Sequence, residues 1–300
     1  YRSSYKDIKG DERYLATTQF ESTDARRAFP CWDEPEHKAT FDVTLVIPEH
    51  LTAVSNMPVI SQTPASHGKT AVSFDTTPVM STYLLAFIVG DISCIEQEST
   101  SGTLMRVWTT KGKEEQGRFA LETSLELLDF YNNYFGIPFP LPKLDHVAIP
   151  DFAAGAMENW GAITYREVAL LVDPENSSAG TRQIVAAIIS HEMAHMWFGD
   201  LVTMKWWNDL WLNESFADYL SYYAMSKGKL FPDSFSNFDP SARKSLKLIM
   251  RASSDSSDSS STMTCPSCGQ FCQNSLIFLS CSWFSTIITF ESESFKIYST

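Results

Sequence analysis

The sequence predicts an α+β protein in which a β-rich N-terminal part precedes a part that mixes helices and strands. Two patterns indicate this. Apolar residues alternate with other residues in the segment 40–91, as in half-buried strands, and from about residue 114 they recur at helical spacing. With 300 residues, of which 44% are hydrophobic and 20% charged, the chain can form one large domain or two smaller ones.

The first predicted domain covers residues 1–95. Phe41, Val43 and Leu45 alternate with other residues along one strand, and the apolar run 83–89 fits a buried strand. Proline and glycine residues separate these segments, and a further strand is expected just beyond this domain, at 104–108. We therefore expect this domain to consist of strands and turns.

The second predicted domain covers residues 96–250. It contains a helix over 114–135, where large apolar side chains lie at helical spacing with charges between them. A pair of strands is expected at 161–165 and 168–172. A second helix is predicted over 181–198 with Thr181 as its N-cap, and a third begins near Asn213.

Residues 251–300 form a third segment, a divergent tail rich in Ser and Cys that we expect to be disordered. Ser and Asp dominate positions 253–261 without apolar periodicity, which is typical of a disordered linker. The apolar stretch 276–290 is shorter than the ~20 residues of a membrane-spanning helix. Cys265 and Cys268 form only half of a zinc-binding pattern, which is weak evidence for a metal site.

Charge and cysteine content limit the classes of partner. The net charge is −13, which argues against nucleic acid or an anionic membrane surface because both recruit basic patches. The first residues show no signal-peptide pattern, and Cys31 with Cys94 makes a poor disulfide framework. We expect a cytoplasmic protein with no membrane segment in this chain.

The strongest chemical signal is the segment His-Glu-Met-Ala-His at residues 191–195, within the second predicted helix. Histidines four residues apart, here His191 and His195, lie on one face of a helix, close enough to hold one Zn²⁺ ion. Glu192 lies beside that face and can reach a zinc-bound water. The alternative is that both histidines are core residues that continue the apolar stripe of the helix.

A third ligand is expected from Glu214, at the start of the third predicted helix. Catalytic zinc sites keep three protein ligands and leave the fourth position to water, so a His₂Glu set is of the catalytic kind. Asp218, one turn further, is in place to accept a hydrogen bond from a ligand histidine. For Asp218, a solvated helix charge is the alternative.

Upstream lies the segment Gly-Ala-Met-Glu-Asn at residues 155–159. This segment, the His-Glu-x-x-His motif and the Asn-Glu-x-Phe-Ala segment around Glu214 follow one another as in the gluzincin zinc metallo-aminopeptidases of the puromycin-sensitive and membrane alanyl aminopeptidase type. The chain resembles that family. The resemblance extends to segments 17–21 and 24–35 and covers about residues 1–230.

The resemblance implies a saddle-like β domain leading into a thermolysin-like α/β zinc peptidase domain, and we expect the first to be incomplete and the second truncated. In the family, the five-residue segment is an edge strand along which the substrate backbone lies, and its glutamate, here Glu158, binds the substrate's α-ammonium group. The Gln-x-Glu segment of the β domain lines the first pocket. The implied substrate contacts are Gln19, Glu21, Gly155, Ala156, Met157, Glu158 and Asn159.

The sequence therefore predicts a hydrolase with one Zn²⁺ per chain that removes the N-terminal amino acid from peptides with a free N-terminus. Glu192 would act as general base toward a zinc-activated water. A zinc endopeptidase would need the same ligands but would give Glu158 and Glu21 no role. A third alternative is an impaired fragment that binds peptide N-termini without cleavage, because the family's catalytic tyrosine, in a Tyr-x-Lys-Gly context, has no counterpart here.

Overall fold

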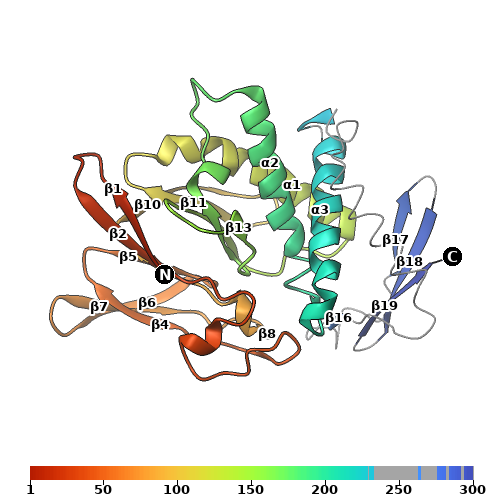
Figure 1. Ribbon diagram of the computed structural model, residues 1–300, viewed down its shortest axis with the longest axis horizontal. Coiled ribbons are helices and arrows are strands. Elements are labelled where there is room, and N and C mark those ends of the chain that lie inside the picture. Colours follow the sequence, from red (N-terminus) through yellow and green to blue (C-terminus); the bar gives the residue numbers. More distant parts are fainter. Residues whose placement is uncertain (229, 233–262, 265–275, 282–283, 292–293, 300) are drawn as a thin grey trace.

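The computed structural model describes residues 1–228, 230–232, 263–264, 276–281, 284–291 and 294–299. Strands dominate the first part of the chain, three long helices the centre, and further strands the end (Figure 1). The predicted order, a β-rich part followed by a part that mixes helices and strands, is confirmed.

The N-terminal part consists of small antiparallel sheets. Their strand orders are β1-β2-β9-β5, β4-β7-β6 and β3-β8. Side chains along β4 alternate between buried and exposed positions as predicted, since Ile47 is buried while Val46 is exposed. The strands are β1 (Arg2–Lys6), β2 (Glu12–Thr17), β3 (Lys38–Ala39), β4 (Thr44–Pro48), β5 (Thr52–Ser55), β6 (Val59–Ala65), β7 (Lys69–Phe74), β8 (Met80–Ser81) and β9 (Phe87–Gly90).

A mixed sheet forms the centre of the molecule, in the order β10-β11-β12-β14-β13. The strand β12 is parallel to both neighbours and entirely buried, whereas β13 pairs antiparallel with β14 at the edge. The predicted domain boundary at residue 95 lies within β10. The strands are β10 (Ile92–Glu98), β11 (Leu104–Thr110), β12 (Lys143–Ile149), β13 (Ala156–Met157) and β14 (Ala162–Arg166).

The prediction of a strand at 168–172 is wrong. A 3-10 turn, Glu167–Ala169, begins there, and the N–H groups of Leu170 and Leu171 both donate to the Glu167 carbonyl. β14 takes β12 and β13 as its neighbours instead. The apolar run 169–172 is buried all the same, which explains why it resembled a strand.

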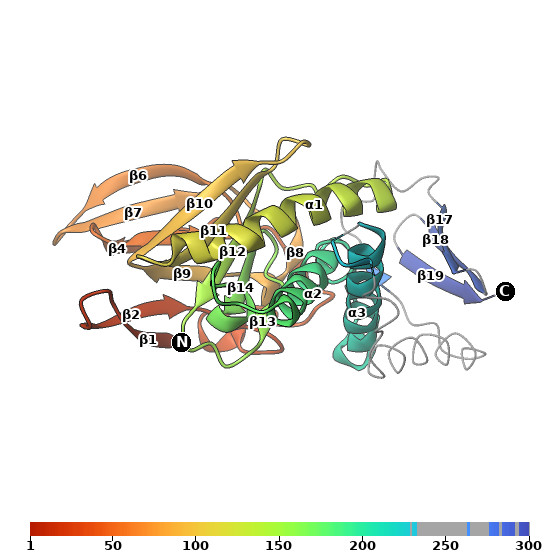
Figure 2. The same cartoon turned by 90° about the horizontal axis from the view of Figure 1, so that it is seen from above.

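Three helices continue the structure away from the sheet: α1 (Arg118–Phe135), α2 (Ala179–His195) and α3 (Leu210–Lys227). Figure 2 shows α1 beside the sheet, with α2 and α3 following in turn. The hydroxyl oxygen of Tyr131 on α1 lies 2.9 Å from the carbonyl oxygen of Ser190 on α2 and 3.3 Å from that of Leu220 on α3. One buried side chain thereby joins all three helices.

The ends of α2 differ from the prediction. Ser178, not Thr181, is the N-cap, since Ser178 Oγ accepts the N–H of Thr181 at 3.1 Å. The helix ends at His195, three residues earlier than expected, because the chain turns back so that Asp200 N donates to the His195 carbonyl. The third helix begins at Leu210, before the expected Asn213.

The tail was expected to be disordered. Its linker 253–261 lies outside the described residues, the apolar stretch 276–290 includes strand segments, and the expected disorder of the tail stays a prediction. The strands of the tail form a sheet with the short strand β15, in the order β15-β16-β19-β18-β17. Their bounds are β15 (Thr203–Met204), β16 (Met263–Thr264), β17 (Leu276–Cys281), β18 (Phe284–Glu291) and β19 (Ser294–Ser299).

Two sequence expectations concern the described residues as a whole. Cys31 and Cys94 are both free thiols. None of the described helices combines the length and the apolar character needed to cross a membrane.

Candidate metal centre and substrate site

Three predicted ligands converge from two packed helices. His191 and His195 lie one turn apart near the end of α2, and Glu214 lies in the first turns of α3. Their Nε2 atoms are 3.0 Å apart, and Glu214 Oε2 lies 3.4 Å and 3.7 Å from them. With metal–ligand distances of roughly 2.1 Å, ligand atoms in a tetrahedral zinc site lie roughly 3.4 Å apart. The observed triangle therefore fits a single zinc ion.

The orientation of His195 is fixed by the loop that follows α2. Its Nδ1 lies 2.9 Å from the carbonyl oxygen of Phe198, which can only accept, so Nδ1 carries the proton and Nε2 of the neutral ring is free for a metal. Gly199 permits this approach, because a Cβ atom there would lie 3.0 Å from Nδ1, and its φ is +138°.

Glu192 is buried beside the two ligand histidines, and its Oε2 accepts no hydrogen bond from the described residues. Burial raises the pKa of this carboxyl well above its ordinary value, while the charge of His195 works in the opposite direction. A carboxylate oxygen that receives no hydrogen bond and lies next to the candidate metal triangle is suited to accept a proton.

A second triangle, of carboxylates, shares one corner with the first. Oxygen atoms of Glu21, Glu158 and Glu214 all lie within 4.8 Å of one another. Burial, and then the charge of Glu158, raise the pKa of Glu21 to about 8, and burial also raises the pKa of Glu158. Glu21 and Glu158 are therefore hard to ionise at the same time. A cation placed between them would stabilise their charged forms, and an ammonium group or a metal ion would supply it.

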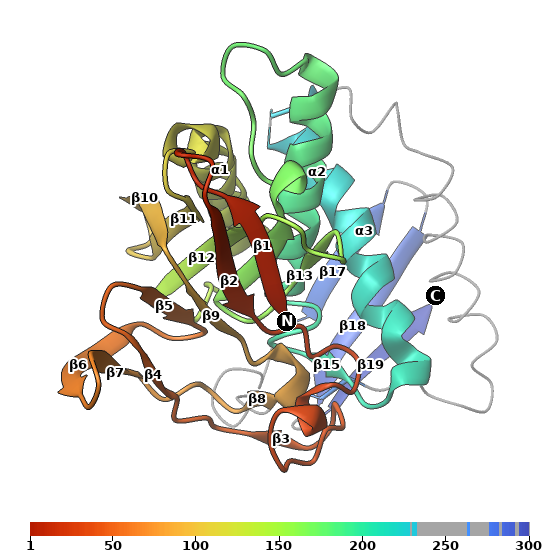
Figure 3. The ribbon, with the colours of Figure 1, turned by 60° about the vertical axis from the view of Figure 1, so that its left-hand side comes forward.

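The segment 155–159 lies at the free edge of the mixed sheet. Figure 3 shows β13 next to α2, and the two elements are in contact. Ala156 and Met157 pair with β14 on one side, and no described strand pairs with the other. Gln19 reaches this strand from the N-terminal part, with Nε2 3.2 Å from Met157 Sδ. Its Oε1 accepts no hydrogen bond from the described residues.

The comparison with family models assigns both parts of the chain. Residues 1–84 match the peptidase M1 N-terminal domain, and residues 119–275, more than half of the chain, match the peptidase family M1 domain. The chain belongs to peptidase family M1.

The M1 chain has relatives with high sequence identity. It is 59% identical over 223 residues to a puromycin-sensitive aminopeptidase of Caenorhabditis elegans, covering 74% of this chain and 24% of that protein. It is 55% identical over 233 residues to aminopeptidase M1-B of Oryza sativa, with 78% and 26% covered. Endoplasmic reticulum aminopeptidase 2 of Bos taurus is 49% identical over 251 residues, with 82% and 26% covered. The chain spans about a quarter of the length of these relatives.

The other residues predicted for the site are Gly155, Asn159 and Asp218. Gly155 is exposed directly before β13, and its carbonyl accepts the N–H of Arg166. Asn159 is buried and its Nδ2 lies 3.1 Å from Thr164 Oγ1. Asp218 lies one turn after Glu214 on α3, and its role toward a ligand histidine stays a prediction.

Several features of the candidate site were not predicted from the sequence. The Phe198 carbonyl and Gly199 orient the candidate ligand His195, and the glycine directly after the predicted helix 181–198 was the available signal for a turn. Asp200 is fully buried, and neither carboxyl oxygen bonds to a described residue. Burial raises the pKa of Asp200 well above its ordinary value. Tyr83 is buried and accepts a hydrogen bond from Asn213 Nδ2 at 3.3 Å. No local pattern separates such residues from ordinary surface or core positions.

Proposed function

We propose that this M1 protein is a zinc aminopeptidase that removes the N-terminal amino acid from peptides. The observation that carries the proposal is that the carboxyl groups of Glu21 and Glu158 lie beside the triangle of His191, His195 and Glu214. Carboxylates that bind an α-ammonium group so close to a metal leave room for one residue before the scissile bond. The aminopeptidase names of the relatives support the same activity.

Zinc bound at the triangle would supply Lewis-acid activation of a water molecule and of the scissile carbonyl group. Glu192 would accept the proton of that water on its carboxylate and return it to the leaving amine. Glu158 and Glu21 would hold the substrate's ammonium group by charge-assisted hydrogen bonds. The products are one amino acid and a peptide shortened by one residue.

The edge strand β13 would position the peptide backbone. An extended peptide can pair with an unpaired strand edge through main-chain hydrogen bonds, which orient it without reading its side chains. Gly155, Ala156 and Met157 would make this contact, and Asn159 would support it by holding the strand's end to Thr164. Gln19, bonded to Met157, would line the pocket from the N-terminal part. The cytoplasmic location expected from the sequence stays a prediction.

Blocking the substrate's amino group tests this function. We expect the zinc-loaded protein to hydrolyse a peptide with a free N-terminus and to lose that activity when the N-terminus is acetylated, because Glu158 and Glu21 then lack an ammonium partner. Equal rates on both peptides would identify an endopeptidase. Binding of the free peptide without cleavage would identify a peptide-binding module.

A further inference from the structure

A tight turn follows Glu158 and reverses the chain from β13 into β14. Ala162 N donates to the Asn159 carbonyl at 2.8 Å, and Gly161 at the third position has a φ of +81°, as in a type II turn. A Cβ atom at Gly161 would lie 2.5 Å from the Asn56 carbonyl oxygen, so the turn packs directly against the N-terminal part. Whatever holds this turn also holds the backbone that carries Glu158.

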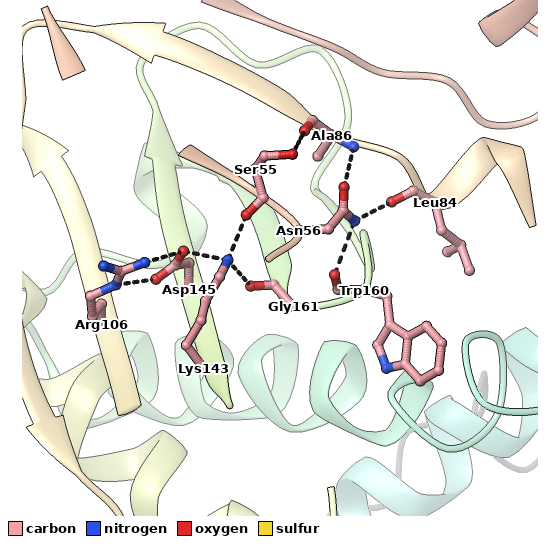
Figure 4. A network of polar contacts seen from close by, with 9 residues as sticks. All are labelled: Ser55, Asn56, Leu84, Ala86, Arg106, Lys143, Asp145, Trp160 and Gly161. Atoms are coloured by element: carbon pink, nitrogen blue, oxygen red, sulfur yellow. Dashed lines mark hydrogen bonds and ion pairs between the residues drawn. The ribbon is translucent and has the colours of Figure 1, made fainter. Parts of the chain in front are cut away.

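Two buried side chains donate hydrogen bonds to the carbonyl groups of the turn (Figure 4). Asn56 Nδ2 donates to the Trp160 carbonyl at 2.9 Å and to the Leu84 carbonyl at 2.8 Å. Lys143 Nζ donates to the Gly161 carbonyl at 2.8 Å. The turn is thus held from the N-terminal part by Asn56 and from the central sheet by Lys143.

Lys143 connects three segments at once. Besides Gly161, its Nζ lies 2.5 Å from the Ser55 carbonyl at the end of β5 and 2.6 Å from Asp145 Oδ2 on the same strand. Asp145 is held on its other side by Arg106, at 2.5 Å and 2.8 Å. Lys143 and Asp145 are both buried, so each of the three ammonium hydrogens has an acceptor within the protein.

We infer that Lys143 is a positioning residue for recognition of the substrate's α-ammonium group, an inference that rests on the function proposed above. Lys143 acts through the turn: by bonding the Gly161 and Ser55 carbonyls it fixes the turn to the N-terminal part and so sets the position of Glu158. Without Nζ, the Gly161 carbonyl retains the Asp145 N–H at 3.0 Å, but the Ser55 carbonyl loses this donor, and the ammonium group no longer joins Ser55 to the turn. The turn then shifts, and Glu158 shifts with it.

The test is the affinity for peptides in a Glu192→Gln background, which removes turnover. Calorimetry compares a tripeptide that has a free N-terminus with its acetylated form, on zinc-loaded protein whose metal content is measured. Lys143→Met should lower the ratio of the two affinities about tenfold, the effect of losing one charge-assisted hydrogen bond, with zinc content unchanged.

Arg106→Met is the matched control. It also removes a cation from Asp145, but it leaves the bonds of Lys143 to Ser55 and Gly161 in place. The ratio of affinities should therefore stay as in the parent, although both variants lose stability. Should Lys143→Met not fold, the charge-balanced double variant Lys143→Met with Asp145→Asn provides the same measurement.

The outcomes separate the two levels of the proposal. An unchanged affinity ratio in the Lys143 variant, or an equal fall in the Arg106 variant, would overturn the positioning role and leave the aminopeptidase function intact. A parent protein that binds free and acetylated peptides equally well would overturn the function itself, and the inference with it.

Discussion

His195 has one ring nitrogen that faces the candidate metal centre and one that faces the chain's own backbone. Because the Phe198 carbonyl holds the proton on Nδ1, Nε2 presents a lone pair to the site whenever the ring is neutral. His191 shares the site but is more exposed, with 24% of its side chain accessible against 1% for His195. The two candidate ligands therefore differ, because His195 is held in one orientation and His191 has more freedom.

Replacing His195 by Ala is expected to remove bound zinc, because only two of the three ligands then remain. Elemental analysis of purified protein measures the metal-to-protein ratio. His37→Ala is the control, since His37 belongs to a separate, more exposed cluster with Glu34 and Glu36 that also brings potential ligand atoms within 4.8 Å. If zinc follows His37 instead of His195, the metal centre is misassigned.

Replacing Glu192 by Gln is expected to keep zinc and abolish hydrolysis. The amide keeps the size of the side chain but cannot accept the proton, and general-base catalysis is typically worth about 10²–10⁴-fold in rate. The variant is assayed for kcat/KM and metal content together. A loss of zinc would mean that Glu192 ligates the metal and does not handle protons.

At the scale of elements, the proposed metal centre depends on the loop after α2 as well as on the helix itself, because this loop holds His195. Gly199→Ala would force a strained backbone at φ +138° and bring a methyl group to 3.0 Å from His195 Nδ1. We expect zinc affinity to fall about 10–100-fold, the usual cost of disturbing a partner of a ligand histidine. Competition with a chelating dye measures it.

Gly180→Ala, near the start of α2, is the control for the Gly199 substitution. The nearest atom to an added Cβ there, Ser178 Oγ, is at 3.7 Å, an ordinary contact. Alanine in a helix is favoured over glycine by about 0.5–1 kcal/mol, so stability should rise slightly and zinc affinity should not change. Equal zinc losses in both variants would show that the loop geometry is not responsible.

The sequence predicted those elements and site residues whose signal is local. Helical spacing located α1 correctly, and the four-residue spacing of His191 and His195 on one helix face needs no tertiary information. The run 168–172 failed because a continuous apolar segment has no period, so it does not separate a buried strand from a buried irregular segment. Lys143 contacts residues far away in the chain, such as Ser55, so neither composition nor local pattern predicts these contacts. The burial of Asp200 likewise has no local signal in the sequence.

At the scale of the whole molecule, the buried His146 in β12 links stability to pH. Burial lowers its pKa to about 4, and its Nδ1 lies 3.0 Å from the Tyr165 hydroxyl. In the unfolded chain the pKa returns to about 6.5, so between these values only the unfolded state takes up the proton. This contribution to stability is complete above pH 6.5 and is lost as pH falls through 4, by about 3 kcal/mol in total.

The expected outcome is that His146→Gln flattens the fall in unfolding free energy between pH 6.5 and 4 relative to the parent protein. Urea unfolding at several pH values measures it. His50→Gln, at an exposed position, is the control and should follow the parent curve. A parallel curve for His146→Gln would mean that this histidine takes up its proton in the folded state as well.

The Tyr131 hydroxyl, placed between Ser190 on α2 and Leu220 on α3, has a consequence for how quickly the metal centre fills. Because the helices that carry the candidate ligands are joined through one buried group, we expect these helices to be in place before an ion arrives, with no helix movement during uptake. Zinc entry should then be a single bimolecular step. Its observed rate should rise linearly with zinc concentration and should not level off, as it would if a slow rearrangement came first.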